Sequence, residues 1–206
     1  MKYILPIFIL SLIKYIMQQL SENVIMLSPG DPFPPMSNDA IKIYLAGSQD
    51  LNPAGNNDWQ TKVATATVEL TEGPNAISVF KGRQWIFVNP KMAPQMNPQP
   101  SLANQEYVNK KTWEMDMANA CDGIFLNFLQ KSVSPLPLFE FGLFASSNKL
   151  IVRCPEGYFQ YSQVAFTCQR MNITLLPTKA NVKDVLWSMA NLLPALQQNK
   201  AIQLPE

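Results

Sequence analysis

The chain alternates between short apolar runs of strand length and longer segments of helical composition. The apolar runs cover residues 40–48, 84–89, 121–129, 149–154 and 173–176. The helical segments begin at Asp58, at Leu102, around Glu140, at Tyr161 and near Val182. Strands that alternate with helices at this spacing favour a parallel sheet with right-handed crossovers. We therefore expect an α/β fold: one domain with a doubly wound, mostly parallel five-stranded sheet in a three-layer α/β/α arrangement.

This pattern divides the chain into four regions. They are an apolar N-terminal leader or helix (1–27), a Pro-rich linker (28–39), the α/β domain (40–177) and a C-terminal amphipathic helix with its tail (178–206). The apolar run from Tyr3 to Ile13 is too short to span a bilayer unless Lys14 lies inside it, and no small-residue cleavage site follows. Three interpretations of the leader therefore stay open. It is a signal or anchor, a helix packed on the domain, or an extension upstream of a later start methionine.

Composition narrows the class of protein and its compartment. The 206 residues are 47% hydrophobic and 15% charged, with a formal net charge of +1 and no long basic run. This charge balance argues against a nucleic-acid polymer as partner. The odd number of cysteines (Cys121, Cys154 and Cys168), all in apolar or helical contexts, favours buried thiols in a reducing compartment. We expect a cytoplasmic protein, and membrane association through residues 3–17 is the alternative.

The chain contains no histidine. A Ser–His–Asp triad, a Cys–His pair and HExxH zinc chemistry are therefore all excluded. Any catalysis must use carboxylates, hydroxyls, lysine or tyrosine. By elimination, a mechanism based on a carboxylate is favoured.

One acid interrupts the hydrophobic pattern. Glu140 lies at an apolar helix start among Leu138, Phe139, Phe141 and Leu143. An ionised side chain is costly to place against a core, so this position needs a reason. Glu140 occupies either the exposed edge of an amphipathic helix or a functional site.

Sheet topology favours the functional interpretation. In open parallel sheets, ligands bind in the crevice beyond the carboxyl ends of the strands. The residues that follow the expected strands are Gly47 and Ser48, Asn89, Ser132 to Glu140, and Pro155 to Tyr158. Gly47 and Ser48 offer a close backbone approach and donors for a phosphate or sugar oxygen. Ser134 precedes the helix, where a serine serves as an N-cap or an anion contact.

Asp122 stands at the start of an apolar strand. It is either a strand-flanking or capping residue, or a carboxylate that holds a substrate hydroxyl or tunes Glu140. The start of a parallel strand usually lies at the opposite end from the crevice, which slightly disfavours the second interpretation. A short strand whose active part lies near its start would reconcile the two.

Three stretches together resemble a known family. They are IYLAGS at 43–48, WEMDMANACDGIFLNF at 113–128 and SPLPLFEFGLFASSNKLIVRCPEGY at 134–158. They are similar to the nucleoside 2-deoxyribosyltransferase-like proteins, which also include deoxynucleoside 5′-monophosphate N-glycosidases. The third stretch is the most specific, because a Glu-x-Gly in an apolar helix followed by K-L-I-V is a family hallmark. The resemblance covers about residues 41–175 and implies a compact flavodoxin- or Rossmann-like domain, commonly a homo-oligomer.

The resemblance also implies roles for individual residues. Glu140 falls on the family's nucleophilic Glu, and Asp122 on a substrate-positioning and proton-handling Asp, although Cys121 replaces the usual small Ala before it. Ser134 stands where nucleoside-preferring transferases tend to have Asp and the monophosphate N-glycosidases have a Ser that meets the phosphate. This departure weakens the case for simple base exchange. The expected substrate-binding residues are Tyr44, Gly47, Ser48, Gln49, Asn89 and Ser134.

The chemistry that the family implies fits the residues available. A carboxylate attacks the anomeric carbon as the base leaves, and the covalent glycosyl-enzyme passes the sugar to another base or to water. This reaction needs neither a metal nor an organic cofactor, and its partner is a small nucleoside or nucleotide. Two alternatives stay open: a non-catalytic nucleotide-binding homologue, and an N-glycosidase that only hydrolyses deoxynucleoside 5′-monophosphates.

Overall fold

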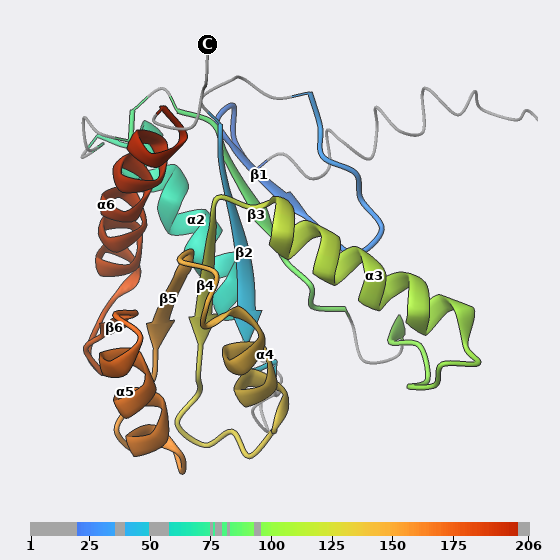
Figure 1. Ribbon diagram of the computed structural model, residues 1–206. Helices are drawn as coiled ribbons and strands as arrows, with labels where there is room; N and C mark the ends of the chain where they lie inside the picture. The colour runs from blue at the N-terminus through green and yellow to red at the C-terminus, as the bar shows by residue number, and fades with distance from the viewer. Residues whose placement is uncertain are drawn as a thin grey trace, which may run out of the picture.

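The computed structural model describes residues 20–35, 40–49, 58–74, 76, 80–81, 83–92 and 96–201. Within these residues, six parallel strands form one sheet (Figure 1). The strands are β1 (Val24–Leu27), β2 (Ile41–Gly47), β3 (Trp85–Val88), β4 (Gly123–Asn127), β5 (Leu150–Arg153) and β6 (Thr174–Leu176). Their order across the sheet is β1-β3-β2-β4-β5-β6. The direction of winding therefore reverses between β2 and β4, the place where ligands bind in sheets of this kind.

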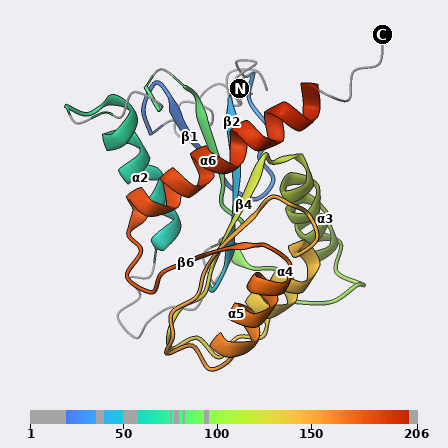
Figure 2. The same ribbon diagram turned by 60° about the vertical axis from the view of Figure 1, so that its left-hand side comes forward.

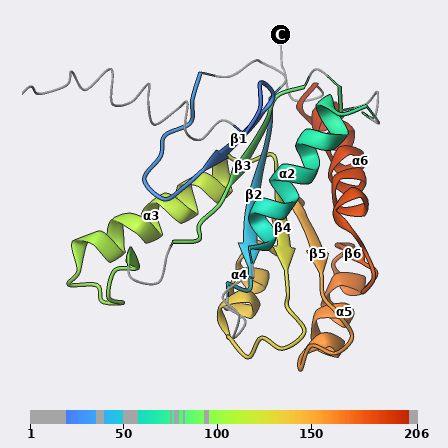
Figure 3. The same ribbon diagram turned by 180° about the vertical axis from the view of Figure 1, so that it is seen from behind.

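Helices cover both faces of the sheet. They are α2 (Trp59–Glu72), α3 (Gln105–Ala120), α4 (Leu136–Phe144), α5 (Tyr161–Arg170) and α6 (Val182–Ala201). Figure 1 looks onto the face that carries α3 and α4, and Figure 3 onto the face that carries α2 and α6. Helices α2 and α6 pack against each other (Figure 2). The expected single doubly wound α/β domain is confirmed, with six strands in place of five.

Two apolar clusters hold the three layers together. One lies between the sheet and α3, α4 and α5, and contains Tyr44 of β2 and Phe141 of α4. The other lies on the face of α2 and α6, and contains Leu45 of β2 and Trp59 of α2. Successive β2 residues thus enter opposite clusters, as strand geometry requires. This two-sided burial explains why the central strands read as continuous apolar runs.

The sixth strand comes from the region expected to be a leader. β1 pairs in parallel with β3, with Val24 opposite Trp85. Part of the expected linker also packs on the domain, because the indole N–H of Trp113 donates to the backbone oxygen of Asp31 at 2.8 Å. The apolar segment 3–17 lies outside the described residues. Among the residues that are described, no helix is both long and apolar enough to cross a membrane.

The ends of β2 and β4 meet closely at the reversal point. Gly47 lies opposite Asn127, and the N–H of Ser48 donates to the backbone oxygen of Asn127 at 2.9 Å. Gly47 has φ of +119°, and a Cβ there would lie 2.3 Å from that backbone oxygen. Only glycine fits this position, both for its conformation and for the space around it.

Replacing Gly47 with alanine should therefore destabilise the fold. We expect Gly47→Ala to lower the free energy of unfolding by at least about 2 kcal/mol, through backbone strain and the clash with Asn127. Gly142→Ala is the matched control, because a Cβ there meets nothing within 4 Å. Helix propensity predicts that this control equals or exceeds the wild type by up to ~1 kcal/mol. Equal denaturant midpoints for the two variants would contradict the assignment.

Candidate active site

Glu140 is held at the reversal point by the backbone of β2. Helix α4 packs on β2 and β4 and directs Phe141 and Phe144 into the core. The neighbouring Glu140 is only 8% exposed, and its Oε2 accepts a hydrogen bond of 2.9 Å from the N–H of Gly47. The acid that interrupted the hydrophobic pattern is therefore buried and paired with the backbone of β2.

Burial makes Glu140 harder to ionise. Desolvation raises the pKa of this carboxyl from 4.5 to about 7, and the hydrogen bond from Gly47 acts in the opposite direction. The charge of Glu114 adds to the rise, whereas the nearby Lys111 and Lys110 lower the pKa. A carboxyl of this kind exchanges its proton near neutral pH, which is typical of groups in functional sites.

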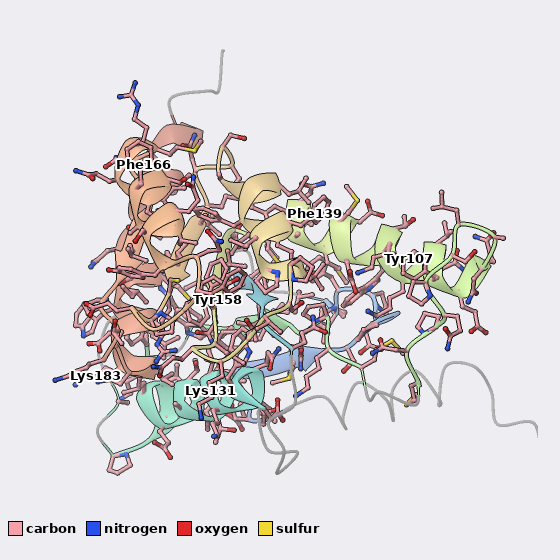
Figure 4. The ribbon with its side chains drawn as sticks, turned by 90° about the horizontal axis from the view of Figure 1, so that it is seen from below. Tyr107, Lys131, Phe139, Tyr158, Phe166 and Lys183 are labelled. Atoms are coloured by element: carbon pink, nitrogen blue, oxygen red, sulfur yellow. The ribbon has the colours of Figure 1, made fainter. Side chains whose placement is uncertain are left out.

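A cavity of about 410 Å³ opens beside Glu140, between α3 and α4. We call it the Glu140 cavity; its walls include Tyr44, Tyr107, Lys111, Glu114, Phe139 and Glu140. Figure 4, seen from below, shows Tyr107 on α3 and Phe139 on α4. Its size suits a small organic ligand, since ligand pockets commonly span about 300–1,000 Å³. Apolar and aromatic walls around a few polar groups are also typical of such pockets.

A second carboxylate enters this cavity from α3. Glu114 is 8% exposed, and its two oxygens accept hydrogen bonds of 2.6 Å from the ammonium groups of Lys110 and Lys111. The lysines precede it by four and three residues, so all three lie on one side of the helix. Glu114 and Glu140 are the carboxylates among the described residues that line this cavity.

A second cavity, of about 440 Å³, adjoins the first and shares Tyr107, Lys111 and Leu136 with it. We call it the Gln49 cavity, since Gln49 lines it directly after the end of β2. Lys110 and residues 97–100, which precede α3, form another part of its wall. The two cavities together form one crevice along α3, beyond the carboxyl end of β2.

Comparison with known proteins gives the chain a family. A family model described as "Nucleoside 2-deoxyribosyltransferase like" matches residues 40–158, more than half of the chain. The chain belongs to this family. The resemblance noted in the sequence is thereby confirmed. A search of curated proteins returned no match.

In this nucleoside 2-deoxyribosyltransferase-like protein, three of the expected site residues lie together beside the Glu140 cavity: Glu140, Gly47 and Tyr44. Gly47 donates to Glu140, and Tyr44 lines the cavity beside it. Burial raises the pKa of the Tyr44 hydroxyl well above its usual value, and the charges of Glu114 and Glu140 add to the rise. Tyr44 therefore stays protonated at neutral pH. Gln49, also expected to bind substrate, lies in the adjoining cavity.

Three further expected residues lie near the crevice but use their polar atoms in local structure. The hydroxyl oxygen of Ser48 accepts from the N–H of Leu129 at 3.1 Å, and that of Ser134 accepts from the N–H of Leu136 at 3.3 Å. The side-chain oxygen of Asn89 accepts from the N–H of Lys91 at 3.0 Å. In the described structure, none of the three lines either cavity.

Asp122 lies at the other end of the sheet. Its Oδ2 accepts from the N–H of Lys42 at 3.0 Å, and its Oδ1 lies 3.6 Å from the Lys42 ammonium. Lys42 stands at the start of β2, whereas Gly47 at the end of the same strand holds Glu140. The structure therefore does not bring Asp122 and Glu140 together, because Asp122 precedes a parallel strand instead of following one.

Glu114 was not predicted from the sequence as a residue of the site. It lies inside the stretch 113–128 that carries the family resemblance, but a glutamate four residues after a lysine reads as an ordinary exposed ion pair. Its burial depends on how α3 crosses the sheet, which periodicity does not specify. Among the described residues, no group of three or more His, Cys, Asp or Glu is arranged to hold a metal ion.

Because the pKa of Glu140 is raised, replacing Glu140 should change the free energy of unfolding by an amount that depends on pH. Between about pH 4.5 and 7 the unfolded chain releases this proton while the folded chain retains it, so wild-type stability falls as the pH rises. Glu140→Gln keeps an acceptor for Gly47 and lacks this loss. Its free energy of unfolding relative to wild type should rise across this window by up to about 3 kcal/mol. Thermal or denaturant unfolding at a series of pH values measures the difference.

The control is Glu69→Gln on the exposed side of α2. The difference between this variant and the wild type should stay nearly constant over the same pH range. A constant difference for Glu140→Gln would contradict the burial of an ionisable Glu140.

Proposed function

We propose that the protein cleaves the N-glycosidic bond of a nucleoside or nucleotide through a covalent glycosyl-Glu140 intermediate. The observation that carries this proposal is the placement of Glu140: buried, bonded to the N–H of Gly47, and facing a cavity of ligand size. Membership of the nucleoside 2-deoxyribosyltransferase-like family supports the choice of bond.

The proposed reaction has two displacements at the anomeric carbon. The ionised carboxylate of Glu140 attacks this carbon while the bond to the base nitrogen breaks, and the base leaves with the electron pair and takes up a proton. A second base or a water molecule then attacks the same carbon and releases the carboxylate. The Gly47 N–H fixes Oε2, so Oε1 is the oxygen that attacks.

The surroundings of Glu140 suit this role. Tyr44 remains protonated and can donate to a sugar oxygen, and Glu114 supplies a second carboxylate in the same cavity. A low-polarity wall strengthens the electrostatic interactions made inside the cavity. We assign to Glu114 the contact with the sugar hydroxyls that the sequence had suggested for Asp122.

Replacing Glu140 should abolish base release. We expect wild type to release free base from at least one deoxynucleoside or deoxynucleotide, and Glu140→Gln to lower the rate by at least about a thousandfold. Chromatography of the reaction mixture, with and without a second base, separates transfer from hydrolysis. Mass spectrometry of quenched wild type should detect a glycosyl adduct on the peptide that contains Glu140.

Glu69→Gln serves as the matched control and should keep wild-type rates, because its side chain is exposed on α2. Full activity of Glu140→Gln would overturn the assignment of the nucleophile. A wild type that binds nucleotides but turns none of them over would leave the non-catalytic alternative in its place.

The pH profile should report the ionisation of Glu140. Only the carboxylate attacks, so kcat/KM should rise with pH and reach a plateau above an apparent pKa of about 7. Glu114→Gln removes a charge that raises this pKa, and should move the midpoint to lower pH. Steady-state rates between pH 5 and 9 at constant ionic strength measure both midpoints. A profile that is flat through pH 7 would count against Glu140 as the ionising group.

A further inference from the structure

Two lysines converge on a single carboxylate in the crevice. The ammonium groups of Lys110 and Lys111 each lie 2.6 Å from a different oxygen of Glu114. Two positive charges therefore face one negative charge at this point. Glu114 and Glu140 line the Glu140 cavity but not the Gln49 cavity, so among the described residues the charged side chains that line the Gln49 cavity are both cationic.

These ammonium groups have donors to spare. Each ammonium has three N–H donors, and each is recorded with one hydrogen bond, to Glu114, among the described residues. The Lys110 side chain is only 11% exposed, so bulk water reaches it poorly. Lys111 additionally lies 6.0 Å from the centre of the Tyr107 ring. Lys111 is 35% exposed, so water reaches its ammonium more readily than that of Lys110. The N–H donors that Glu114 does not use can bind an acceptor on a ligand.

Both lysines line the Gln49 cavity. Gln49 lines the same space, two residues after the end of β2. Residues 97–100 close another part of the wall without adding a charged side chain. Within the described structure, the charged side chains of this wall are therefore Lys110 and Lys111, both held by Glu114, and its neutral polar side chains are Gln49, Asn97, Gln99 and Tyr107.

We propose that Lys110, Lys111 and Gln49 form a subsite for an anionic group, a phosphate or a carboxylate, carried by the substrate. The proposal rests on the function proposed above, because the subsite adjoins the cavity of Glu140. A charge-assisted hydrogen bond from each ammonium and one from the amide would hold the anion. Substrates that bear such a group are preferred over neutral nucleosides.

The anion has two chemical sources on a nucleoside. It is either a phosphate on the sugar or an acidic substituent on the base. Ser134, which the family resemblance placed at a phosphate, lines neither cavity in the described structure. The lysines of α3 are the cationic groups that face the crevice in this part of the protein.

Binding is measured by calorimetry in the Glu140→Gln background, so that no turnover interferes. The ligands are a deoxynucleoside, its 5′-monophosphate, and a deoxynucleoside whose base bears a carboxylate. We expect at least one acidic ligand to bind about tenfold or more tightly than the neutral one, with an advantage that shrinks as salt is added. The ligand that shows the advantage identifies the source of the anion.

Substitutions that remove or keep the positive charge then test the role of the two lysines. Lys111→Met should reduce the advantage of the acidic ligand about threefold, and Lys110→Met/Lys111→Met should abolish it. Lys111→Arg should retain it. Glu114→Gln should increase the advantage of the acidic ligand, because the carboxylate that competes with the ligand for Lys110 and Lys111 is then gone. Lys62→Met, an exposed change of equal charge on α2, is the control and should leave it unaltered.

The outcomes separate this inference from the proposed function. Equal binding of all three ligands, or an advantage that survives loss of both lysines in a folded variant, overturns the subsite whether or not wild type releases base. A lysine-dependent advantage in a protein that releases no base from any ligand keeps the subsite and overturns the N-glycosidic reaction. Thermal melting confirms that each variant is folded.

Discussion

The site depends on one hydrogen bond, from the N–H of Gly47 to the carboxylate of Glu140. It joins the end of β2 to the helix that follows β4, and so bridges the point where the sheet reverses its winding. The backbone of Gly47 can present its N–H there because the residue has no side chain to meet Asn127. Burial makes the ionised acid costly, and this bond offsets part of that cost.

Much of the fold could be read from the sequence, because the central strands are apolar on both faces. β2, β3, β4, β5 and β6 all fall within the expected runs, and Asp58 caps α2 by accepting from the N–H of Thr61. β1 was not predicted, since its four apolar residues form the end of the region interpreted as a leader. It becomes a strand through parallel pairing with β3, about sixty residues later in the chain.

The site was predictable only in part. Glu140 stood out because an acid among aromatic and aliphatic residues conflicts with the hydrophobic pattern. Glu114 gave no such signal, since its lysine neighbours make α3 read as a solvated helix. Motif similarity matched Asp122 to a substrate-positioning residue, and the direction of β4 places it against Lys42, at the other end of the sheet from Glu140. Chain direction alone fixes the end of the sheet at which a strand-flanking residue lies, and this separates Asp122, before β4, from Glu140, after β4.

The sequence separation of Gly47 and Glu140 also bears on when the candidate site forms during folding. The two residues are 93 positions apart, and α4 is only nine residues long. A helix this short gains its order from tertiary packing, here on β2 and β4. Loop closure on that scale is slow compared with local helix formation. Formation of the Gly47–Glu140 hydrogen bond during refolding would therefore follow the pairing of β2 with β4, well after the helical signal returns.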